Sequence, residues 1–236
     1  MNTRNRSILA LLLTTGVIAL ALPKARAQQP VAANYSAVIT SVDDRLNVFN
    51  GLLTPGKTVG GHYDYDPAQL DTVAIDAFTA LHVSNKRDAA HFSFAAGPLA
   101  LGANYLILTT VNDRPGTGDN YGISYNTNYP ALFTQFDSDL YDVTYPVLSL
   151  SLNDPYGQAL SSLDTPLTIP SLSQFTQAEG SLRVIVTDLN TFDEFTATAK
   201  FRITRLDAVV PEPGSLALLL VVGVSGGMLA LRRRAK

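Results

Sequence analysis

The residues best suited to bind a ligand form a short acidic run in the second half of the chain. Asp137, Asp139 and Asp142 place three carboxylates close together in the sequence. Calcium takes several carboxylate and carbonyl oxygens from flexible loops, so this run is a candidate calcium site. No Asp-x-Asp-x-Asp-Gly loop ending in Glu accompanies it, and aspartate is common in turns for backbone reasons alone. We expect solvated turn aspartates, with calcium as the alternative and no other cofactor.

The three histidines are the other candidate metal ligands, since imidazole is the commonest neutral ligand. They are His62, His82 and His91, and no pair has the close spacing of a metal-binding motif. His82 and His91 flank a polar stretch, 84–88, which predicts a hairpin connection. We therefore expect ordinary surface or edge-strand histidines.

The sequence contains no recognisable catalytic motif. Ser124 lies in the segment 122–126, which lacks the second glycine of a Gly-x-Ser-x-Gly elbow and has strand-like flanks. The absence of cysteine excludes disulfides, thiol catalysis, zinc–thiolate sites and iron–sulfur clusters. We expect a protein that is not an enzyme. The alternative, a polysaccharide hydrolase, would need two convergent carboxylates roughly 5 to 10 Å apart.

Tyrosines are concentrated between residues 120 and 156. An exposed row of tyrosines could stack on sugar rings, because the side chain has an apolar face and a polar tip. The simpler expectation is that they fill strand positions and core edges. The residues concerned are Tyr121, Tyr125, Tyr129, Tyr141, Tyr145 and Tyr156.

The elements that would position these side chains are β-strands. In the segment 195–206, Phe195, Ala197, Ala199, Phe201 and Ile203 alternate with polar residues, which indicates one buried and one solvated face. Further strands are expected at 35–42, 58–65, 73–83, 91–94, 105–111, 121–125, 147–152 and 182–188, with Gly, Pro, Asn and Asp between them. Roughly nine strands and no amphipathic helix favour an all-β domain, a single β-sandwich or jelly roll over 28–208.

The first 27 residues have the pattern of a secretory signal peptide. Arg4 and Arg6 precede an apolar stretch, 7–22, and Ala25 and Ala27 are the small residues that a signal peptidase recognises. We expect a signal-peptide helix over 1–27, with cleavage after Ala27. The alternative is an uncleaved N-terminal anchor.

The last 28 residues have the pattern of a membrane stop. The segment 215–231 carries no charge and is just long enough to cross a bilayer as a helix. Arg232, Arg233, Arg234 and Lys236 follow it, and such a basic cluster stays on the cytoplasmic side. We expect a transmembrane helix over 215–231, with the preceding chain outside the cytoplasm.

These features resemble the PEP-CTERM sorting domain of Gram-negative bacteria. The motif Pro211-Glu212-Pro213, the apolar helix and the basic tail occur within 209–236 in the order of that family. The resemblance implies recognition by an exosortase, removal of the helix, transient residence in the inner membrane, and a link to exopolysaccharide and biofilm formation. The alternative is an ordinary C-terminal anchor with a Pro-rich spacer.

Two segments of the middle region resemble exported PEP-CTERM ectodomains. The stretch 57–66 is similar to their V-x-G-x-F-x-Y-D strand, with His62 where an aromatic residue is usual. The stretch 163–175 is similar to their L-P-x-x-P-x-L-x-x-F segment. This resemblance implies a β-sandwich and no particular chemistry.

The charge of the chain changes when both end segments are set aside. The whole chain has 17 Lys and Arg against 20 Asp and Glu. Eight of the basic residues lie in the end segments, so residues 28–213 hold nine basic against 20 acidic residues, a formal charge of −11. Such acidity argues against nucleic acid and anionic lipid as partners.

We therefore expect an exported surface or extracellular-matrix protein with a structural or adhesive role. Before processing it would be anchored by its C-terminal helix, and afterwards it would lie on the cell surface or outside the cell. Its processing partners would be signal peptidase and exosortase, and extracellular polysaccharide is a candidate partner. The alternative function is a carbohydrate-binding module, with or without calcium.

Overall fold

The computed structural model describes residues 30–84, 86, 88–126, 139–143 and 146–209. The predicted signal peptide, sorting motif, membrane helix and basic tail lie outside these residues. Within them, two 3-10 turns, η1 (Pro67–Gln69) and η3 (Leu172–Gln174), interrupt a chain made mainly of strands. The strands are β1 (Val31–Asp43), β2 (Thr58–Tyr65), β3 (Leu70–Asp76), β4 (Thr79–Ser84), β5 (Ala90–Ala96), β6 (Leu99–Ala103), β7 (Ile107–Arg114), β8 (Gly118–Asn126), β9 (Tyr141–Val143), β10 (Val147–Asp154), β11 (Gln177–Asp188) and β12 (Glu194–Ala208).

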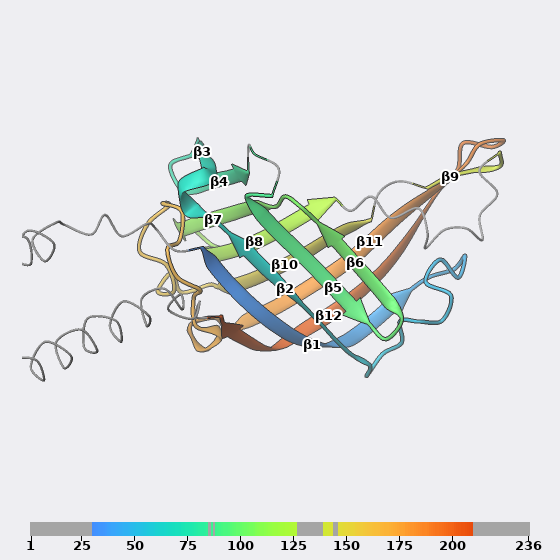
Figure 1. Cartoon of the computed structure of the whole chain (residues 1–236), viewed down its shortest axis with the longest axis horizontal. Coiled ribbons are helices and arrows are strands. Elements are labelled where there is room, and N and C mark those ends of the chain that lie inside the picture. The colour runs from blue at the N-terminus through green and yellow to red at the C-terminus, as the bar shows by residue number, and fades with distance from the viewer. Residues whose placement is uncertain (1–29, 85, 87, 127–138, 144–145, 210–236) are drawn as a thin grey trace, which may run out of the picture.

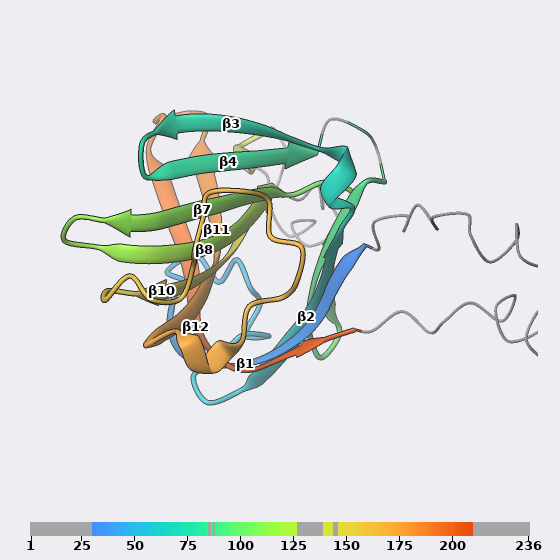
Figure 2. The same cartoon turned by 90° about the vertical axis from the view of Figure 1, so that its left-hand side faces the viewer.

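The strands form one continuous antiparallel sheet, which confirms the all-β prediction. Its order is β3-β4-β7-β8-β10-β11-β12-β1-β2-β5-β6, with β9 paired to β11. The sheet curls, so that β1 and β2 lie on one side of the molecule and β7, β8 and β10 lie on the other (Figures 1 and 2).

The curl brings the apolar faces of distant strands together. The rings of Phe92 on β5 and Tyr125 on β8 have centroids 5.1 Å apart, and Phe94 on β5 lies 5.7 Å from Phe201 on β12. Ring pairs at these separations add to the free energy gained from burial. The core is therefore a single cluster between the two halves of one sheet.

The expected strand pattern differs from the structure in three places. The segment 73–83 is a hairpin of β3 and β4, because the Asp76 carboxylate accepts the amide of Phe78 at 2.8 Å and closes a turn. β6 follows the turn at Gly97 (φ +65°), and its sequence, Leu-Ala-Leu-Gly-Ala, lacks the polar and β-branched residues that mark a strand. β9 has only three residues, which are too few to show a period.

The alternation expected for 195–206 is present with one exception. Ala197, Ala199, Phe201 and Ile203 are buried, whereas Phe195 is 37% exposed. The neighbouring strand β1 ends at Asp43, opposite Thr198, so residues 194–197 of β12 extend beyond the end of β1. Phe195 therefore belongs to the apolar face of β12 but lies beyond the core.

Candidate binding site at the pole opposite the chain ends

The first and last strands of the domain are antiparallel neighbours. β1 pairs with β12 from Ala33 opposite Ala208 to Asp43 opposite Thr198, and the amide of Val209 donates to the carbonyl of Ala32 at 2.8 Å. Both chain ends therefore leave the domain at one pole. We call the other end of these two strands, with the hairpin turn 189–193, the distal pole; it lies at the right of Figure 1.

The hairpin turn at the distal pole presents an aromatic side chain to solvent. Phe192 is 77% exposed and has a φ of +61°, which is unusual for a bulky residue. Its amide donates to the Asp188 carbonyl at 2.7 Å, and the Asp188 carboxylate accepts the amides of Asn190 and Thr191 at 2.8 and 3.2 Å. These bonds hold the backbone of the turn, which leaves the Phe192 side chain in solvent.

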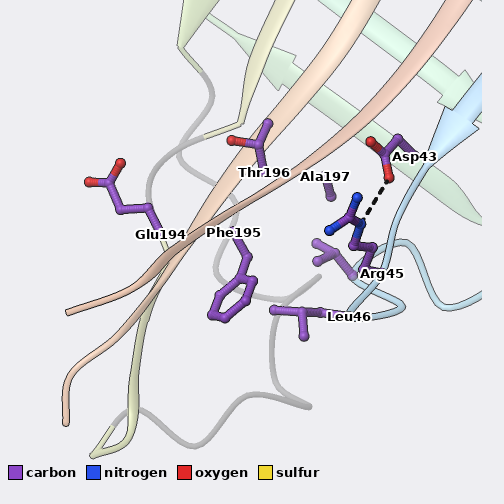
Figure 3. Close-up of a pocket in the computed structure, with 8 residues that line it drawn as sticks. Asp43, Arg45, Leu46, Glu194, Phe195, Thr196 and Ala197 are labelled. Carbon is purple, nitrogen blue, oxygen red and sulfur yellow. Dashed lines mark ion pairs between the residues drawn. The ribbon is translucent and has the colours of Figure 1, made fainter. Parts of the chain in front are cut away.

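Beside this hairpin lies a hollow of about 180 Å³ (Figure 3). Asp43, Arg45, Leu46 and Val48 line one side, and the first residues of β12, 194–197, line the other. Phe195 and Leu46 point toward one another, and Glu194 stands on the other side of β12 from Phe195. The lining thus combines apolar surface with two carboxylates and one guanidinium.

The hollow exists because β12 has no paired strand along this part of one edge. Residues 194–197 pair with β11, and within the described residues no strand pairs with their other edge, since β1 stops at Asp43. The chain turns away there because the Asp44 carboxylate accepts the amides of Val48 and Phe49 at 2.6 and 2.8 Å. Val48 and Phe49 are buried, so the wall of the hollow is anchored in the core.

The charges at the hollow are exposed to solvent. The Arg45 Nε lies 4.0 Å from the Asp43 Oδ1, and the two side chains are 88% and 71% exposed. Such a pair contributes little to stability. Both groups therefore keep most of their hydrogen-bonding capacity for a ligand.

The predicted calcium candidates do not form a site in the described residues. Asp137 lies outside them, Asp139 is exposed in the turn before β9, and Asp142 is exposed on β9 opposite Thr187. Among the residues that the structure describes, no three His, Asp or Glu side chains are arranged to hold a metal ion.

The expectation of surface histidines is wrong for His82, which is fully buried. Its Nδ1 lies 2.9 Å from the hydroxyls of Thr72 and Thr165, and its Nε2 lies 2.9 Å from that of Thr110. Burial lowers the pKa of His82, and the charge of Asp164 opposes the shift. The neutral ring ties the segment around Thr165 to strands β3, β4 and β7, a role that spacing in the sequence could not reveal.

His62 and His91 share one carboxylate on the outer face of the sheet. His62 Nε2 lies 3.1 Å from Asp64 Oδ2, and His91 Nδ1 lies 2.8 Å from Asp64 Oδ1. Asp64 and His91 are register partners on β2 and β5, and His62 lies two residues before Asp64 on the same face. The cross-strand register thus explains this grouping.

Two buried carboxylates, Asp119 and Asp154, face one another on β8 and β10. Asp119 accepts the amides of Asp113 and Leu160 at 2.8 and 2.7 Å, and Asp154 accepts those of Tyr156 and Gln158 at 3.1 and 2.8 Å. All four oxygens are used to fix loops. The structure therefore gives this pair the role of holding the backbone of neighbouring segments in place.

The tyrosines of the region 120–156 that the structure describes do not form an exposed row. Tyr121 and Tyr125 point into the core, Tyr141 is half-buried on β9, and Tyr156 is 76% exposed in the turn after β10. Burial raises the pKa of Tyr121 well above its ordinary value, and its hydroxyl donates to that of Tyr63. Tyr129 and Tyr145 lie outside the described residues.

Comparison with known proteins adds no relative. No protein-family model matches the chain, and neither a curated protein nor a solved structure is significantly similar to it. In the described part of the chain, no helix has the length and apolar character needed to cross a membrane. The predicted span 215–231 lies outside that part.

Proposed function

We propose that the protein is an exported PEP-CTERM-type surface protein whose β-sandwich-like ectodomain has a structural or adhesive role outside the cell. Signal peptidase would act after Ala27, and an exosortase would recognise Pro211-Glu212-Pro213. The proposal rests on the two end segments, which have the composition and order of export and sorting signals.

The structural observation that supports display of a contact surface is the position of the two ends of the domain. The Val209–Ala32 hydrogen bond places the start of β1 and the end of β12 at one pole. A domain attached at that pole would present its distal pole to the surroundings, and there the exposed Phe192 and the hollow lie. This arrangement suits display of a contact surface.

A surface-labelling experiment tests the proposal. An epitope inserted between Asn190 and Thr191, in the exposed turn, should bind antibody on intact cells of the native host. Replacing Pro211, Glu212 and Pro213 together by alanine should abolish that labelling while the protein is still made. If antibody reached the epitope-tagged protein with its Pro-Glu-Pro motif intact only after the cells were lysed, export to the surface would be contradicted. Deletion of the gene should change cell aggregation or polysaccharide retention, and unchanged behaviour would contradict the matrix role.

The second candidate function is a polysaccharide-binding module. It is favoured by the hollow, where a partly exposed Phe195 lies among carboxylates and a guanidinium. Aromatic rings stack on the C–H faces of sugars, and charged side chains bond their hydroxyls. For the calcium-dependent form of this function, the described residues contain no group of three His, Asp or Glu side chains that could hold the ion.

A further inference from the structure

We propose that the hollow at the distal pole binds a polysaccharide that carries free amino groups, and that such a polymer is the matrix component this domain contacts. The inference rests on the proposed extracellular role and specifies its ligand. Three properties of the site lead to it: an apolar contact surface, excess negative charge and a small volume.

The apolar surface comes from Phe195 and Leu46. Phe195 keeps 37% of its surface exposed because β12 extends beyond β1, and Leu46 faces it from the adjoining connection (Figure 3). Folding leaves this apolar area in contact with water. A sugar ring offers a flat C–H face that would cover it, whereas its hydroxyls would remain at the polar rim.

The charge around this surface favours a cationic ligand. Two acidic residues, Asp43 and Glu194, and one basic residue, Arg45, line the hollow. Two more aspartates, Asp188 at the end of β11 and Asp193 in the hairpin turn, come shortly before Glu194 in the sequence. The region 28–213 as a whole, these residues included, carries a formal charge of −11. Such a field attracts ammonium groups and repels uronic acids, so charge separates amine-bearing from acidic polysaccharides.

The shape favours a polymer over a free sugar. A hollow of about 180 Å³ is smaller than the roughly 300–1,000 Å³ of sites that enclose a drug-sized ligand. Glu194 and Phe195 stand on opposite sides of β12. A polysaccharide that crosses this edge of the strand would therefore contact the two side chains with different sugar units. Individually weak contacts of this kind gain strength when successive units bind together.

Polymer binding by the full chain in detergent tests the proposal. The probes are a soluble glucosamine polymer, the same polymer N-acetylated, and a uronic acid polymer, compared in pull-downs at 0.05 and about 0.15 M salt. We expect the glucosamine polymer to bind about tenfold more tightly than the N-acetylated form at the lower salt, and the uronic acid polymer not to bind.

Matched variants locate the site. The double variant Asp43→Asn with Glu194→Gln, and separately Phe195→Ala, should each weaken binding by about tenfold. The charge-matched control, Asp71→Asn with Glu179→Gln, changes exposed positions on β3 and β11 and should bind as the unaltered protein does. Unfolding midpoints of all variants show whether the fold is retained.

Three results would overturn the proposal: no binding, equal binding of the N-acetylated polymer, or equal loss in the control variant. These measurements need no export. Failure here leaves surface labelling of cells unaffected, and failure of surface labelling leaves binding in solution unaffected, so the two proposals fail separately.

Discussion

The amide nitrogen of Val209 lies 2.8 Å from the carbonyl oxygen of Ala32 and donates a hydrogen bond to it. This bond continues the β1–β12 ladder to the last described residue, so both ends of the domain lie at one pole. The hollow and the hairpin turn lie at the other pole. The proposal of a displayed contact surface uses this asymmetry.

Gly61 should be intolerant of any side chain. It lies where the regular pairing of β2 with β5 is interrupted, and a Cβ there would overlap the Ser93 carbonyl oxygen and lie 2.6 Å from the Tyr35 hydroxyl. That hydroxyl donates to the same carbonyl at 2.8 Å. We expect Gly61→Ala to reduce the free energy of unfolding by about 3 kcal/mol in urea titrations.

The control for this variant is Gly102→Ala on β6, where the nearest atom to a new Cβ is an ordinary 3.7 Å away. It should cost less than about 1 kcal/mol. Equal losses in the two variants would contradict a steric requirement at Gly61.

Stability should depend on pH through His82. Burial holds its pKa below the ordinary value, so the unfolded chain takes up a proton that the folded chain resists. The contribution is fully present above about pH 6.5 and is lost as the pH falls below it. Urea unfolding at pH 7.5 and 5.5 should show this loss, and His82→Gln should show a smaller difference between the two pH values. An unchanged difference would exclude His82 as its source.

Asp119 should be essential for holding the end of β7 and the loop after β10. Replacing it with alanine leaves the amides of Asp113 and Leu160 without their acceptor. We expect a loss of about 2–4 kcal/mol in the free energy of unfolding. Asp142→Ala, at an exposed position on β9, is the control and should be nearly neutral. If Asp119→Ala were equally mild, the buried carboxylate would not have a structural role.

Phe192 should be dispensable for folding. Its ring is 77% exposed and its φ is +61°, a conformation that asparagine adopts more readily. We expect Phe192→Asn to keep or raise the free energy of unfolding, by up to about 1 kcal/mol. Phe201→Ala, on the same strand pair but buried, should cost about 3–5 kcal/mol. A large loss at Phe192 would mean that the ring serves the fold.

The strand pattern was readable because burial on one face imposes period-two alternation. β12 shows this most clearly, with Ala197, Ala199 and Phe201 inside. β6 is not predicted because its sequence, Leu-Ala-Leu-Gly-Ala, lacks polar and β-branched residues, and β9 is not predicted because three residues are too few to show a period. The hairpin at Asp76 was missed because one side-chain bond ends an otherwise continuous apolar stretch.

The hollow could not be predicted from the sequence. Asp43 and Glu194 are far apart in the chain and line one hollow because β1 and β12 are neighbours. The alternation predicted Phe195 as a core residue, and only the end of β1 at Asp43 leaves its ring exposed. Acidic runs, in contrast, are visible in the sequence, yet Asp139 and Asp142 are ordinary exposed positions in the fold.

The most direct test of the central claim is the intact mass of the native protein from its own cells. The proposed export and sorting predict a mature chain that begins at Gln28 and lacks the segment from Ser215 onward. A mass equal to that of the full chain, from cells with an active exosortase, would contradict it.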